Sequence, residues 1–93
     1  MSLFFQDKFH RIIRLSNERI KHIGKHMDLK DVLYLLEATL LHPDILTINE
    51  LQTDVYYYQK YLKDEHLYFI VVVKMFNGTG FILTLYEGEK QKQ

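Results

Sequence analysis

The spacing of the apolar residues changes at His42-Pro43, and this change limits the folds open to the chain. Before that point apolar side chains recur at helical spacing, as Val32, Leu36 and Leu40 do. After it the period is two, and Val, Ile, Tyr and Phe dominate, which is typical of β-strands. Because helices come before a run of strands, the sequence predicts an α+β domain with its helices on one face of an antiparallel sheet.

The predicted elements follow from these patterns and from the residues that end them. Ser16 is a typical N-cap, and a residue before proline leaves the helical region, so His42 ends the second helix. The prediction is a strand at 11–15, helices at 17–27 and 29–41, and strands at 45–48, 55–62, 67–76 and 81–86. That gives a sheet of four to five strands. Residues 77–80 form a tight hairpin, which would pair Lys74 with Leu83 and point Lys74 away from Thr84.

Length and composition indicate a single domain over residues 1–93, with a core at about 11–86 and a charged tail at 87–93. The chain has no cysteine, which excludes disulfides and thiol chemistry. Its longest apolar run, 67–73, is far shorter than the roughly 20 residues that span a bilayer, so we expect no membrane contact and a cytoplasmic protein.

Charge is balanced overall but separated along the chain. Residues 8–30 contain seven cations against two anions, and residues 31–66 contain seven anions against two cations. A polyanion could find a cationic face in the first block, although the same charges also fit an ordinary solvated surface of mixed sign.

Most enzyme templates are excluded, because the chain has neither a glycine-rich phosphate loop nor a serine nucleophile motif. His22 and His26 have the i, i+4 spacing that zinc sites use, but no glutamate or third ligand accompanies them, so we expect no metal.

A different site fits the same helix. Helical geometry places Arg19, His22 and His26 within roughly 60° of one another, beside the apolar residues Ile20, Ile23 and Met27. Imidazoles exchange protons near neutral pH and arginine clamps phosphate, which together suit RNA cleavage without a metal. The alternative is a solvated helix flank on which two histidines are four residues apart.

The tyrosines are open to two interpretations. Side chains at 56–58, 61, 68 and 86 could stack on RNA bases, or they could pack across strands. Thr84 and Tyr86 are two apart on the last predicted strand and therefore share a face.

Taken together, the segments 13–23, His26, 42–44, 67–74 and 80–86 resemble a small bacterial and phage-associated nuclease family of the barnase–EndoU–colicin–RelE superfamily, which includes toxin endoribonucleases. The chain departs from the family pattern at Ile20, at Met27-Asp28 and at Leu85, which stands where the pattern has alanine.

The resemblance implies a RelE/barnase-like fold and endoribonuclease activity without a cofactor. It assigns catalytic positions to Arg19, His22 and His26, and positions that bind the substrate to Arg14, Thr84 and Tyr86. One histidine would take the 2′-hydroxyl proton while the other protonates the leaving oxygen. The implied partners are RNA and an antitoxin protein, whose acidic segment would cover residues 8–30. A homodimer and a non-catalytic interaction module with an exposed edge strand stay open as alternatives.

Overall fold

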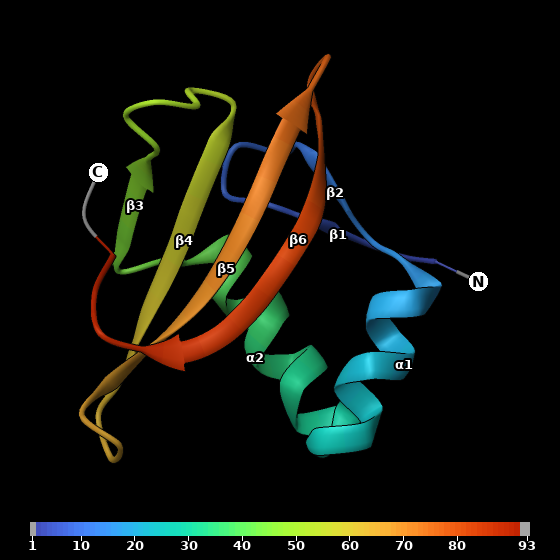
Figure 1. The fold of residues 1–93 in the computed structure, drawn as a ribbon, viewed down its shortest axis with the longest axis vertical. Helices are drawn as coiled ribbons and strands as arrows, with labels where there is room; N and C mark the ends of the chain where they lie inside the picture. The colour runs from blue at the N-terminus through green and yellow to red at the C-terminus, as the bar shows by residue number, and fades with distance from the viewer. Residues whose placement is uncertain (1, 92–93) are drawn as a thin grey trace.

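The computed structural model describes residues 2–91, with the backbone alone for His26 (Figure 1). The elements in this part of the chain are β1 (Leu3–Gln6), β2 (Ile12–Leu15), α1 (Asn17–His26), α2 (Leu29–Leu41), β3 (Ile45–Ile48), β4 (Val55–Leu62), β5 (Leu67–Phe76) and β6 (Thr79–Gly88). They confirm the α+β class. Over residues 2–91 the sheet has six strands in the order β1-β2-β6-β5-β4-β3, where the sequence predicted four or five.

Local signals explain both helices. Ser16 caps α1 by accepting a hydrogen bond from the Arg19 amide, and Asp28 caps α2 by accepting from the amides of Lys30 and Asp31. α2 has the predicted bounds and ends at His42, where the backbone leaves the helical region. Among the described residues, neither helix has the length and apolar character needed to cross a membrane.

The first two strands correct the predicted sheet. β1 was not predicted, and it forms an antiparallel pair with β2 in which Phe5 lies opposite Ile13. β2 then pairs with β6 in parallel, with Ile13 opposite Gly80. The sheet is therefore mixed rather than wholly antiparallel, because β2 runs parallel to β6 where it pairs with the residues just after the β5–β6 turn (Figure 1).

The hairpin between β5 and β6 is tighter than predicted. Asn77 and Gly78 both have positive φ, at 51° and 82°, as the two central residues of a type I′ turn do. The turn therefore has two residues, and Lys74 lies opposite Phe81 rather than Leu83. Further along, Ile82 and Thr84 lie opposite Val73 and Val72, which leaves Leu83 as the extra residue of a β-bulge.

Apolar residues fill both faces of the central strand β5. On one face, Val32, Leu36 and Leu40 of α2 pack with Phe69, Val71 and Val73, together with Ile23 of α1. On the opposite face Val55, Ile70 and Val72 form a smaller cluster with Tyr57, Tyr68 and Tyr86. Residues 69–73, which are apolar without alternation, are therefore covered on both faces of the sheet. The helix-covered face and the helix-free face are named accordingly below.

Candidate functional site

A pocket opens between α1 and β6, at the edge of the helix-covered face. Its volume is about 220 Å³. The residues that line it are Leu15, Arg19, His22, Ile23, Met27, Ile82, Thr84 and Leu85. It therefore brings together three of the predicted site residues, Arg19, His22 and Thr84, which come from segments more than sixty positions apart in the printed sequence.

α1 contributes both polar and apolar side chains to this pocket from neighbouring turns of the helix. Arg19 and His22 are three residues apart and lie on neighbouring parts of the helix surface. Both are exposed, while Ile23 is buried against the core and fixes the rotation of the helix. The rim of the pocket is therefore cationic and able to donate hydrogen bonds, and its floor is apolar.

β6 supplies the opposite wall through its bulge. Leu85 belongs to the cluster under the helices, whereas Thr84 lies opposite Val72, whose side chain faces the helix-free side. Thr84 nevertheless lines the pocket. A bulge bends its strand and re-aims the neighbouring side chains, which accounts for a threonine at the border between the two faces.

Two other predicted site residues, Arg14 and Tyr86, do not line this pocket. Arg14 faces the helix-free side beside Phe4 and Phe81, and its Nε donates to the Ser2 hydroxyl over 3.0 Å. Tyr86 packs in the smaller cluster, where burial raises its pKa. His26 is the last residue of α1, and its side chain lies outside the described part of the structure.

The sequence reasoning missed most of the apolar lining. Ile23 and Met27 were placed beside the predicted site but not in it, and Ile82 and Leu85 were not singled out as site residues. A signal existed for Leu85, because the family pattern has a smaller residue at that position. In the structure this leucine occupies part of the pocket wall.

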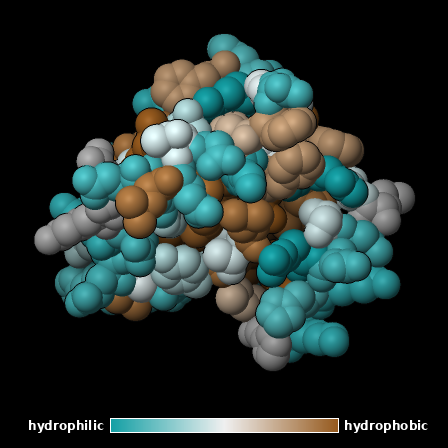
Figure 2. All heavy atoms as spheres, turned by 45° about the horizontal axis from the view of Figure 1, so that its top comes forward, coloured by the Kyte–Doolittle hydropathy of each residue, from teal (hydrophilic) through white to brown (hydrophobic). Residues whose placement is uncertain are grey.

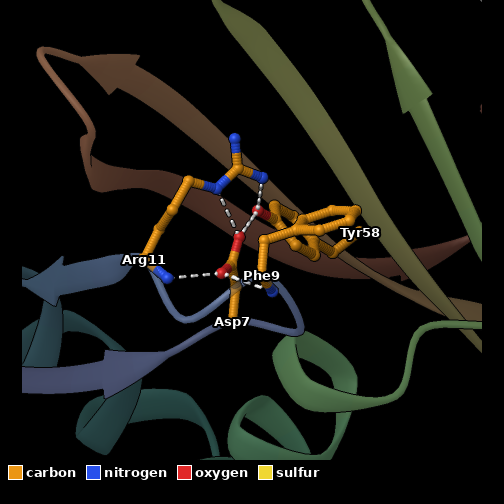
Figure 3. Close-up of polar contacts among 4 residues, drawn as sticks. All are labelled: Asp7, Phe9, Arg11 and Tyr58. Atoms are coloured by element: carbon orange, nitrogen blue, oxygen red, sulfur yellow. Dashed lines mark hydrogen bonds and ion pairs between the residues drawn. The ribbon is translucent and has the colours of Figure 1, made fainter.

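A second polar cluster lies around the buried carboxylate of Asp7, in the loop between β1 and β2 (Figure 3). Its Oδ2 accepts from the Tyr58 hydroxyl at 2.6 Å and from the Arg11 Nε at 2.8 Å. Its Oδ1 accepts from the amides of Phe9 and Arg11. The Arg11 Nη2 also donates to the Tyr58 hydroxyl, which closes the network.

This network explains the shifted pKa values in the core. Burial alone would raise the pKa of Asp7, but the hydrogen bonds from Tyr58, Arg11 and Phe9 together hold that pKa below its usual value. Burial first, and then the neighbouring Asp7 carboxylate, raise the pKa of Tyr58. Each group has its partners inside the protein, so we assign the cluster to stability rather than to chemistry.

The structure also shows where the three arginines of residues 8–30 lie. Arg11 is held between Asp7 and the rings of Phe9 and Tyr56, with its guanidinium carbon 5.0 Å from each ring centre. Arg14 faces the helix-free side, and Arg19 lines the pocket. These three arginines therefore do not share one cationic face.

Aromatic side chains follow the packing interpretation more closely than the stacking one. Tyr58 is buried, and Tyr61 and Tyr68 pack across β4 and β5 with ring centres 5.1 Å apart. Apolar residues do reach the surface, as the brown groups among teal ones in Figure 2 show. The most exposed aromatics of the sheet are phenylalanines, with Phe4 64% and Phe76 62% exposed.

Among the described side chains, no group of three or more histidines, aspartates and glutamates gathers at one point as a metal site requires. Comparisons with models of protein families, with curated proteins and with solved structures find no match to this chain. The likeness to the nuclease family therefore depends on the sequence motifs alone.

Proposed function

We propose that this protein is an endoribonuclease that cleaves RNA without a metal ion, at the pocket between α1 and β6. One observation carries the proposal: Arg19, His22 and Thr84 line the same pocket although they come from separate parts of the chain. These are a group that binds phosphate, a group that transfers protons and a hydrogen-bond donor, which is the set that RNA cleavage needs.

In this reaction His22 takes the proton from a ribose 2′-hydroxyl, and the 2′ oxygen attacks the adjacent phosphorus. The bond from phosphorus to the 5′ oxygen breaks, and that oxygen receives a proton. The products are a 2′,3′-cyclic phosphate and a free 5′-hydroxyl. Arg19 would neutralise the charge that grows on the phosphoryl oxygens, and Thr84 would donate a hydrogen bond to one of them. The family likeness gives the two proton transfers to His22 and His26 without saying which acts first; in this proposal His26, one helical turn beyond His22, supplies the second proton.

The apolar floor supports a role in holding the substrate. Ile82, Leu85 and Met27 form a recess beside the cationic rim, in which the flat face of a base is shielded from water. Arg14 and Tyr86 are not part of this recess, so the proposal gives them no role at the scissile phosphate. A toxin held by an antitoxin is the biological setting that the family likeness suggests.

The test is cleavage of a single-stranded RNA by the purified protein in EDTA, with the product ends analysed by mass. We expect 2′,3′-cyclic phosphate ends, and we expect His22→Gln to lower the rate by about 10²–10⁴-fold. His42→Gln is the matched control, because that exposed histidine lies at the end of α2 and does not line the pocket. The cleavage rate of Arg19→Ala is measured in the same way, with Lys21→Ala as its control.

A substrate with a single 2′-deoxy nucleotide at the cleaved position separates attack by the 2′-hydroxyl from hydrolysis by water. That nucleotide has no 2′-hydroxyl and cannot attack its own phosphate. The proposal fails if folded wild-type protein leaves RNA intact, if the deoxy substrate is cut, or if His22→Gln and His42→Gln cleave equally. Absence of cleavage would favour the non-catalytic interaction module.

A further inference from the structure

The outer edge of β6 is paired with another strand only as far as Phe81. Up to that residue β2 lies beside it, with Arg14 opposite Phe81. β2 ends at Leu15 and the chain turns into α1, whereas β6 continues to Gly88. Within residues 2–91, no strand pairs with the outer edge of β6 beyond Phe81. Pairing with β5 uses the backbone groups of every second residue, so the alternate residues direct theirs to this open edge. Such an edge is able to accept an added strand.

Two pockets lie along this edge, and their spacing matches that of alternate side chains on a β-strand. A second pocket adjoins the first, and Met27 lines both. On β6, Leu85 lines the first pocket and Glu87 the second. Residues two apart on a strand are about 6.6–7 Å apart, and the alternate side chains of an added strand have the same spacing. Neighbouring same-face side chains of such a strand would therefore lie over the two pockets.

The two pockets differ in charge. Arg19 and His22 border the first, while Asp31 and Glu87 border the second. Apolar side chains form the floor of both, with Leu85 in the first and Val32 in the second. The groove therefore distinguishes the two ends of an extended segment by charge.

We infer that this groove binds an extended segment of a partner protein, which pairs with β6 as an added β-strand. The segment carries apolar side chains at alternate positions, an acidic residue beside Arg19 and a basic residue beside Glu87. Backbone hydrogen bonds give affinity and the two pockets give specificity, as in other cases of strand addition. The bound segment covers Arg19 and His22, so it also blocks RNA from the pocket; this last consequence rests on the proposed function.

The test selects binders from a displayed library of random decapeptides against the full chain, without RNA. Selected sequences are expected to alternate apolar residues and to place an acid and a base at opposite ends. Amide shifts in an NMR titration with the best peptide should concentrate on α1 and on residues 82–88. The double variant Asp31→Lys/Glu87→Lys should weaken that peptide about tenfold, and should prefer a peptide without the base.

A matched control keeps the same change in net charge away from the groove. Glu37 and Glu89 are exposed and line neither pocket, so Glu37→Lys/Glu89→Lys should bind as the wild type does. The inference is overturned if no peptide is enriched, if shifts fall on β1 or β3, or if both double variants bind alike. It is also overturned if a second copy of this chain occupies the groove, seen as a dimer whose interface protects residues 82–88.

RNA cleavage is measured separately, so the two proposals fail independently. Peptide binding without any cleavage supports the added strand and removes the nuclease. Cleavage that the selected peptide does not inhibit retains the nuclease and contradicts the proposed block.

Discussion

Asp7 is a charged residue inside the protein, and its surroundings show how the fold accommodates it. The carboxylate accepts two side-chain and two backbone hydrogen bonds, and the Tyr58 donor comes from a strand fifty-one residues away. This contact ties the loop between β1 and β2 to β4 across the core. The sequence shows Asp7 only as a polar residue after an apolar stretch, because nothing local to it indicates the distant tyrosine.

Removing the charge of Asp7 should destabilise the protein. In Asp7→Asn an NH₂ group replaces one carboxylate oxygen, which leaves two hydrogen-bond donors facing a third. We therefore expect the free energy of unfolding at neutral pH to fall by about 2–4 kcal/mol. The lowered pKa contributes stability above the ordinary carboxyl value of 3.8, and this contribution is lost as pH falls through the lowered value. The gap to wild type should therefore narrow below pH 3.8.

Chemical denaturation at several pH values measures this gap. Asp64→Asn is the control, because Asp64 is exposed in the turn between β4 and β5. A gap that stays constant between neutral pH and the acid limb would show that the Asp7 charge does not matter.

At the scale of elements, the predictions succeeded where the signal is local. Caps, helical spacing and the proline give the bounds of α2, and runs of β-forming residues give β3, β4 and β5. β1 was not predicted, and neither was the parallel pairing of β2 with β6, which joins residues far apart in the sequence. Arg14 directly precedes Leu15, which lines the pocket, and neighbours on a strand point to opposite faces, which explains why Arg14 does not line it.

Substituting two glycines by alanine should change the stability of the protein in opposite directions. Gly78 has a φ of +82° in the turn, so Gly78→Ala should cost about 1 kcal/mol in backbone strain. Gly24 lies in α1, and an added Cβ would meet no atom within 4 Å, so Gly24→Ala should gain about 0.5–1 kcal/mol. Thermal unfolding measures both, and the explanation is wrong if the two changes have the same sign.

At the scale of the whole molecule, the candidate site follows from how β6 is placed. One part of it lies between β2 and β5, and the remainder faces α1 across the pocket. The predicted grouping of Arg19 and His22 depended on helical spacing, which the sequence contains. The approach of Thr84 depends on the bulge and on the parallel pairing, which no local pattern indicates. Residue spacing alone therefore predicted the helical half of the candidate site, whereas Thr84 of the sheet half was named only through the family resemblance.

The most direct test of the pocket is to map where RNA binds. A short RNA with 2′-O-methyl groups cannot attack its own phosphate, so its complex with wild-type protein stays intact during an NMR titration. We expect amide shift changes concentrated on residues 19–23 of α1 and 82–85 of β6, and weakened by Arg19→Ala. Changes confined to the helix-free face, or none at millimolar RNA, would contradict the claim that this pocket is the nuclease site.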